Sequence, residues 1–174
     1  MPTFIALLRG VNVSGQRRVP MSDLRSLFEG LGYTDVRTYI QSGNVVFRAK
    51  AGTAAGIRST IESAIEAEFG FDVTVLLRTA AELAGVVKRN PYGTDAYVTF
   101  LDGAPAAKVV KTIDPHAFAP DEFAVLGHEV FLRCPNGYGN TKINNTFFER
   151  KLATNATTRN WKTVTTLLDW ATTK

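Results

Sequence analysis

The stretch TYIQSGNVVF at residues 38–47 decides the fold of the first half of the chain. Strand-forming residues at 36–41 and 44–48 flank Ser42-Gly43, and this arrangement predicts a β-hairpin. Upstream, the run Phe4 to Leu8 is continuously apolar and predicts a strand that ends in a polar corner. The hairpin turn is also polar and carries a glycine. Two strands therefore lead into corners of similar chemistry.

Helical signals separate these strands. Ser22 is expected to cap a first helix, which Gly32 ends in the position where glycine commonly follows a helix. A second helix is predicted between the cap Thr53 and the stop Gly70. A strand over residues 72–78 completes the order β-α-β-β-α-β, which predicts a ferredoxin-like plait.

The strand order 4-1-3-2 of such a plait makes the first and third strands central. Phe4–Leu8 and Val45–Phe47 are apolar at every position, whereas the presumed edge strand at 36–41 alternates. Central strands without alternation predict a sheet that is buried on both faces. The helices of one plait cover one face only, so we expect the second half of the chain to cover part of the other.

The second half repeats this pattern in part. A helix opens with the capping box at Thr79–Glu82 and stops at Asn90-Pro91. A strand over 96–101, a helix near Pro105 and a hairpin around Gly127-His128 follow. Thr157-Thr158 are expected to cap a last helix, whose apolar stripe would bury Trp161 in the core.

These observations predict an α+β protein of two packed ferredoxin-like subdomains. The first spans residues 1–90 and includes a connecting helix. The second spans residues 91–174 and is expected to be degenerate, with two C-terminal helices in place of a clean final strand.

Composition excludes several classes of protein. Of the 174 residues, 45% are hydrophobic and 21% charged, a globular balance that argues against disorder. The apolar runs are too short to span a bilayer, and the N-terminus lacks the pattern of a signal peptide. One cysteine excludes an internal disulfide framework. We therefore predict a cytoplasmic protein without membrane contact.

The net charge of +4 is concentrated near the C-terminus, because residues 142–174 hold six basic side chains against two acidic ones. Such a region can attract nucleic acid or another polyanion. A solvated helix face would give the same pattern.

Polar residues from two segments are expected to meet at one edge of the first sheet. The first strand ends, the second strand ends and the third begins at this edge. An arginine side chain, amides beside glycines and the start of the first helix suit an anion such as phosphate or carboxylate. The alternative is structural, because these residue types also form turns and cap backbone groups. The candidate ligand-binding residues here are Arg9, Gly10, Asn12, Gln41, Ser42, Gly43 and Asn44.

Catalytic and metal chemistry find little support. Cys134 with His116 or His128 would supply a nucleophile and a base, but no spacing in the chain favours that pair. Two histidines and one cysteine without ligand spacing argue against a zinc site. We assign no catalytic residue and expect neither a metal nor a cofactor.

Three motifs carry a family resemblance. LLRGVNV at residues 7–13, TYIQSGNVVF at 38–47 and TRNWKTV at 158–164 resemble domain-of-unknown-function family 1697. The family pattern usually has Gly-Gly after the first Asn-Val, where this chain has Ser14-Gly15. The resemblance implies a cytosolic bacterial α+β protein with ferredoxin-like subdomains. It implies no activity, but it adds Arg159 to the candidate ligand residues.

The sequence thus favours a protein that binds a small anionic ligand at a polar sheet edge. Nucleic-acid binding through the basic C-terminal region and an enzyme of unknown reaction remain alternatives. The first alternative is weakened because Phe4 and Phe47 have the pattern of core residues rather than of an exposed RNA-stacking surface.

Overall fold

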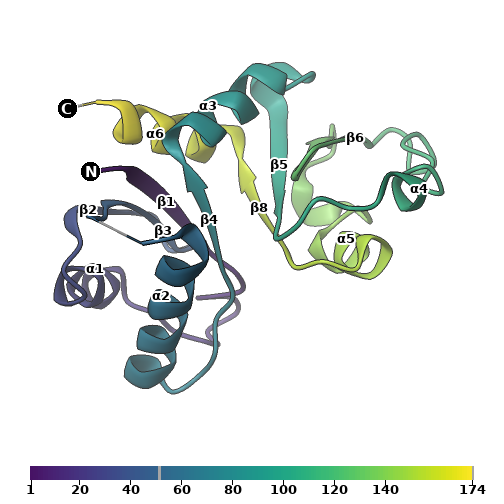
Figure 1. Ribbon diagram of the computed structural model, residues 1–174. Coiled ribbons are helices and arrows are strands. Elements are labelled where there is room, and N and C mark those ends of the chain that lie inside the picture. The colour runs from purple at the N-terminus through teal and green to yellow at the C-terminus, as the bar shows by residue number, and fades with distance from the viewer. Residues whose placement is uncertain (51, 174) are drawn as a thin grey trace. The chain divides into compact units, whose positions relative to one another are not determined.

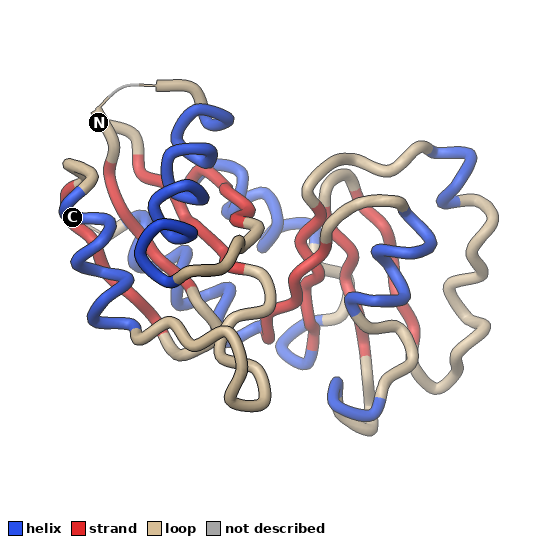
Figure 2. The backbone as a smooth tube through the Cα atoms, turned by 90° about the horizontal axis from the view of Figure 1, so that it is seen from below, coloured by secondary structure: helices blue, strands red, loops and turns tan. Residues whose placement is uncertain are grey.

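A computed structural model describes the chain except for residues 51 and 174. It contains two compact units, one of Met1–Ala84 with Thr166–Lys174 and the other of Gly85–Thr165. In each unit the strands lie together as a sheet with helices alongside (Figures 1 and 2). The division expected after residue 90 stays a prediction. Both boundaries between the compact units fall inside helices. The two-subdomain α+β fold is confirmed.

The first unit follows the predicted order of elements. Its sheet has the antiparallel order β2-β3-β1-β4, as expected for a plait. The elements are β1 (Thr3–Leu8), α1 (Met21–Gly30), β2 (Thr34–Tyr39), β3 (Asn44–Arg48), α2 (Ala54–Phe69), β4 (Val75–Thr79) and α3 (Ala80–Arg89), which continues into the second unit.

Local signals explain most of these bounds. The Thr53 hydroxyl accepts a hydrogen bond from the Gly56 N–H at the start of α2, and Gly70 ends that helix with a φ of 81°. The capping role expected of Ser22 is wrong. Helix α1 begins at Met21, directly after the extended Pro20, and no side chain caps it.

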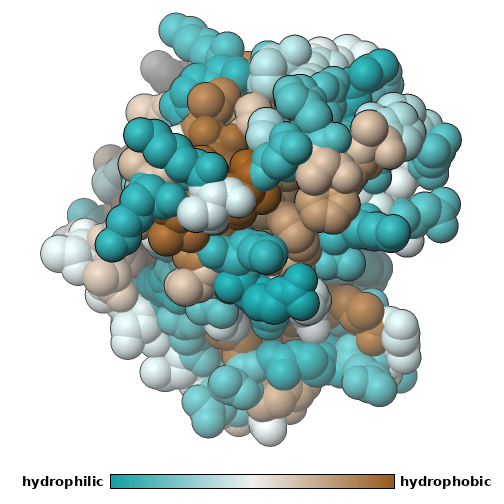
Figure 3. Space-filling view, turned by 90° about the vertical axis from the view of Figure 1, so that its right-hand side faces the viewer, coloured by the Kyte–Doolittle hydropathy of each residue, from teal (hydrophilic) through white to brown (hydrophobic). Residues whose placement is uncertain are grey.

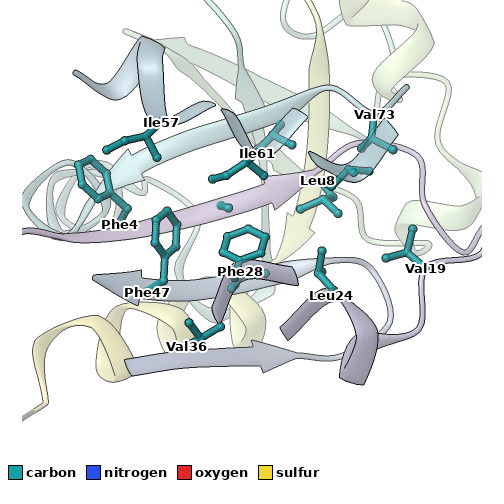
Figure 4. Close-up of a cluster of buried hydrophobic side chains, with 14 of the residues drawn as sticks. Phe4, Leu8, Val19, Leu24, Phe28, Val36, Phe47, Ile57, Ile61 and Val73 are labelled. Atoms are coloured by element: carbon teal, nitrogen blue, oxygen red, sulfur yellow. The ribbon is translucent and has the colours of Figure 1, made fainter. Parts of the chain in front are cut away.

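The core of the first unit lies between the sheet and helices α1 and α2. Figure 4 shows the rings of Phe28 of α1 and Phe47 of β3 side by side, and their ring centres are 5.1 Å apart. Phe4, on the neighbouring strand β1, stacks on Phe47 with ring centres 5.8 Å apart. Both phenylalanines of the central strands are therefore core residues, as predicted.

The central strands are also buried on their other face, as expected. Ile5, Leu7 and Val46 alternate with the core residues and have exposed fractions of 3% or less. Arg37 lies beside Val46 in the register of β2 and β3. Its guanidinium carbon is 3.8 Å from the ring centre of Trp170, so the C-terminal end of α6 (Trp161–Thr172) packs on this face.

The second unit has a complete four-stranded sheet with the antiparallel order β6-β7-β5-β8. The expectation that a final strand is missing is wrong. The elements are η1 (Gly93–Asp95), β5 (Ala96–Leu101), α4 (Ala107–Val110), β6 (Glu122–Leu126), β7 (Glu129–Arg133), η2 (Tyr138–Asn140), α5 (Asn145–Leu152), β8 (Ala156–Asn160) and the start of α6.

Residues read as a helix cap form strand β8 instead. Thr157 and Thr158 pair with Phe100 and Thr99 of β5. The cap of α6 lies further along, where the Asn160 side chain accepts a hydrogen bond of 2.8 Å from the Thr163 N–H. Threonine suits both a cap and a strand, and pairing with β5 decides between them.

The core of the second unit contains the aromatic residues of α5. Phe147 and Phe148 are buried, and Phe148 lies edge-to-face with Phe123 of β6. The predicted burial of Trp161 is wrong, because its ring is half-buried and the buried residues of α6 are Thr163, Val164 and Leu167. The side of this unit that carries α4 and α5 shows a hydrophobic patch within a hydrophilic surface (Figure 3).

In the described part of the chain, every helix is too short or too polar to cross a membrane.

Candidate functional site

The corner after β1 and the turn between β2 and β3 lie together, as the strand order predicts. The side-chain amide of Asn12 donates hydrogen bonds to the carbonyls of Val19 and Gln41 at 2.9 and 2.8 Å. Its oxygen accepts from the Val19 N–H at 2.8 Å. Asn12 has a φ of 56°, a conformation that asparagine tolerates better than most residues. This side chain therefore joins the loop before α1 to the hairpin turn.

We expect Asn12→Ala to loosen this loop without unfolding the protein. The variant loses three hydrogen bonds of a partly exposed side chain, which should destabilise the loop by about 1–2 kcal/mol. Amide hydrogen exchange at Val19, whose N–H donates to Asn12, should accelerate roughly tenfold. Gln16→Ala, an exposed position in the same loop, is the control. Unchanged exchange at Val19 would show that Asn12 does not hold the loop.

The turn residues also have structural roles. The buried Asn44 amide donates to the carbonyl of Tyr39 at 2.8 Å and to the Ser42 hydroxyl at 2.9 Å. Gly43 has a φ of 86° and packs closely against Leu8 and Val11. Hydrogen bonding and packing thus explain much of the polar corner.

The remaining candidates of this corner differ in exposure. Gly10 and Gln41 are exposed, whereas Arg9 and Ser42 are half-buried. The backbone N–H of Arg9 donates to the Thr74 carbonyl at 3.0 Å. A ligand role for these residues stays a prediction.

Arg159 lies in the second unit and is buried on β8. Its guanidinium donates to the Thr157 hydroxyl at 2.7 Å and to the Thr158 carbonyl at 3.0 Å. Burial lowers the pKa of Arg159 to about 10, so the side chain still carries its charge at neutral pH. Arg9 belongs to the first unit, and a pocket shared by the two arginines stays a prediction.

Thr158 is the centre of a polar network that sequence reasoning missed. Its hydroxyl donates to the Asn145 side-chain oxygen at 2.6 Å and accepts from the Tyr138 hydroxyl at 3.1 Å. The Thr99 hydroxyl lies 2.7 Å from the Thr158 hydroxyl. Because Thr158 donates its single hydroxyl proton to Asn145, Thr99 is the donor of this second hydrogen bond to Thr158. Three segments of the second unit are thereby joined at one oxygen.

A groove of about 620 Å³ opens at one end of the second sheet, where β5 begins and β7 and β8 end. Arg133 and Lys162 are exposed there, and the rings of Tyr97 and Trp161 are half-buried. Sequence reasoning had placed Asn160 and Trp161 in a motif but had not connected them with the other segments. The groove is lined by Thr94, Asp95, Ala96, Tyr97, Arg133, Cys134, Pro135, Gly137, Asn160, Trp161 and Lys162.

The groove carries more positive than negative charge. Its lining holds two basic side chains and one acidic one, Asp95. Arg133 also lies 3.4 Å from Glu122 in an ion pair that is partly exposed to solvent. Helix α6 begins at the groove with Trp161, and helix N-termini favour negative charge. These features suit an anion.

Cys134 lines the groove, but its surroundings do not activate it. Burial raises the pKa of its thiol above the usual value, and nearby Asp121 raises it further. A hydrogen bond with the Thr141 side chain opposes these effects only in part. The thiol is therefore protonated at neutral pH, when a nucleophile needs the thiolate. Among the residues that the structure describes, no three His, Cys, Asp or Glu side chains gather as metal ligands would.

Fold and site together define an α+β protein of two four-stranded antiparallel sheets, with a polar corner in one unit and a charged groove in the other. The family DUF1697, described as a protein of unknown function, matches residues 1–131. The chain belongs to this family, and the identification made from its motifs is confirmed. The match ends before the motif at 158–164.

A solved structure extends the likeness to nearly the whole chain. The conserved bacterial protein SP0830 from Streptococcus pneumoniae superimposes with a TM-score of 0.76 and 21% sequence identity, over 98% of both chains. This likeness shows the shared fold. No curated protein matches the sequence.

Proposed function

We propose that this protein binds a small anionic ligand in the groove of its second unit. The observation that carries the proposal is the meeting of Arg133, Lys162 and the first turn of α6 at one hollow. Arginine and lysine donate charge-assisted hydrogen bonds, which are stronger than neutral ones. The Lys162 side chain has neither a hydrogen bond nor an ion pair with another residue of the described chain.

The same ligand has a second predicted location at the sheet edge of the first unit. Among the candidate residues of that corner, Arg9 and Ser42 are half-buried and Gln41 is exposed. Asn12 and Asn44 are already hydrogen-bonded to the backbone there. The groove is therefore the better supported site.

Nucleic-acid binding is supported less well by the same observations. Phe4 and Phe47 are core residues of the first sheet, so these rings are not available to stack on bases. Arg159, one of the six basic residues near the C-terminus, is buried. The C-terminal charge is therefore smaller at the surface than the sequence suggests.

We expect Arg133→Ala and Lys162→Ala each to weaken binding of inorganic phosphate or an organic acid. A hydrogen bond to a charged group contributes about 1.5–3 kcal/mol, hence roughly a tenfold to hundredfold loss of affinity. Isothermal titration at low ionic strength measures the effect. Arg150→Ala removes an exposed charge from α5, away from the groove, and is the matched control.

Two results would contradict the proposal. The first is that the wild-type protein binds none of the anions. The second is that the control variant loses as much affinity as the groove variants. In the second case the anions would respond to net charge rather than to a site. Arg9→Ala in the same titrations tests the first unit's sheet edge as the alternative location.

A further inference from the structure

We propose that the ligand of this groove is a phosphate monoester that carries a flat aromatic ring, as a nucleoside monophosphate does. This inference rests on the proposed function and names the class of its ligand. Three features of the groove support it, namely its size, its aromatic wall and its one carboxylate.

The groove is too large for a simple anion. Its volume of about 620 Å³ lies in the range of roughly 300–1,000 Å³ that is typical of organic-ligand sites. An inorganic phosphate would contact Arg133 or Lys162 and leave most of this space to water. A ligand that fills it needs a body attached to the anionic group.

The lining supplies a surface for a flat ring. Trp161 is half-buried in the wall, and in the described chain its indole makes neither a ring contact nor a hydrogen bond. Trp161 is also the first residue of α6, directly before Lys162. A ring stacked on this indole would therefore lie close to the charges that hold a phosphate.

The other aromatic group of the lining, Tyr97, is held in place by its neighbours. Tyr97 stacks on Tyr138 with ring centres 5.3 Å apart and an angle of 27° between the planes. Tyr138 is held in turn by its hydrogen bond to Thr158. A rigid tyrosine pair loses little conformational entropy when a ligand packs beside it.

Asp95 is the one lining residue that a bare anion would not favour. A carboxylate accepts hydrogen bonds, and the hydroxyls of a sugar or the amino group of a base donate them. A ligand with an anionic end and a donor-rich body explains why both signs of charge line one groove. This combination is found in a nucleoside monophosphate.

The test compares four probes by isothermal titration at low ionic strength: AMP, ribose 5-phosphate, adenosine and inorganic phosphate. Stacking of one base on an aromatic side chain contributes about 1–3 kcal/mol, so AMP should bind roughly fivefold to 140-fold more tightly than ribose 5-phosphate. Trp161→Ala should remove this difference and leave the affinity for ribose 5-phosphate within about twofold. Trp161→Phe should keep part of the difference.

Trp170→Phe, in the first unit, is the matched control and should change neither affinity. Circular dichroism establishes that each variant is folded. Equal affinity for AMP, ribose 5-phosphate and phosphate would overturn this inference and leave the proposed anion site standing. Binding of adenosine as tight as that of AMP, or no binding of any probe, would overturn the proposed function as well. Affinity that rises steadily with the length of an oligonucleotide would overturn the mononucleotide ligand.

Discussion

Gly43→Ala is expected to destabilise the first unit by about 2–5 kcal/mol, because the added Cβ causes both backbone strain and steric overlap. Gly43 has a φ of 86°, where an L-residue with a side chain costs about 1–2 kcal/mol. A Cβ placed there would lie 2.8 Å from the Leu8 Cβ and 2.9 Å from Val11 Cγ2. Both neighbours are buried, so relieving the contact requires movement of the core, at about 1–3 kcal/mol.

The close approach has a backbone origin. The Leu8 N–H donates to the Gly43 carbonyl at 2.9 Å, which draws the end of β1 onto the hairpin turn. A shift that made room for a methyl group would weaken this hydrogen bond. We therefore expect the damage to reach the pairing of β1 with β3, and the register at Leu7 and Asn44 is the nearest part.

Gly10→Ala separates the two costs. Gly10 has a φ of 70°, but a Cβ there would meet no atom within 4 Å. This variant should lose about 1–2 kcal/mol from the backbone conformation alone. Denaturant unfolding followed by the fluorescence of Trp170, in a Trp161→Phe background, reports on the first unit. Equal losses at Gly43 and Gly10 would show that steric contact contributes nothing.

The first sheet was predictable because its signals are local. The Ser42-Gly43 turn fixes the hairpin, and Thr53 and Gly70 bound a helix through contacts made within the helix itself. The strand order then follows from the plait, since few other orders satisfy this sequence of elements. The individual elements thus need only neighbouring residues, and the topology rules supply the strand order.

The second sheet was predictable only in part, since Thr157-Thr158 is ambiguous. Both residues are good helix caps and good strand formers, and pairing with distant Thr99 and Phe100 selects the strand. If Thr157-Thr158 capped the helix, Trp161 would lie one turn into it and face the core. In the structure Trp161 is the first helical residue and borders the groove.

The same ambiguity hid the groove. Its lining comes from the starts and ends of β5, β7 and β8, and these segments meet only if β8 exists. The polar corner of the first unit shows the opposite case. Topology correctly brought Asn12 near Gln41, but side-chain direction decides whether an amide faces a ligand or a carbonyl. Sequence alone contains no signal for that direction.

Thr158→Val is expected to destabilise the second unit strongly. Valine has nearly the shape of threonine, so the effect reports on the hydroxyl alone. The variant removes one donor and two accepting positions at once, and it leaves Tyr138, Thr99 and Asn145 each short of a partner. A lost hydrogen bond between neutral groups costs about 1 kcal/mol, and more where the remaining group is buried, so we expect about 3 kcal/mol in total.

Two further variants test whether the hydroxyl of Thr158 is the cause. Thr158→Ser keeps the hydroxyl and should retain most of the stability, whereas Tyr138→Phe breaks one of the three hydrogen bonds and should cost about 1 kcal/mol. Unfolding followed by Trp161 fluorescence, in a Trp170→Phe background, reports on this unit.

If Thr158→Val lost no more stability than Tyr138→Phe, the network would contribute no more than a single hydrogen bond. If Thr158→Ser were as unstable as Thr158→Val, the hydroxyl would not be the sole cause, because the serine variant keeps it. The graded order of Ser, Phe and Val variants is expected because one oxygen serves three partners, and this arrangement also holds Tyr138 against Tyr97 at the wall of the groove.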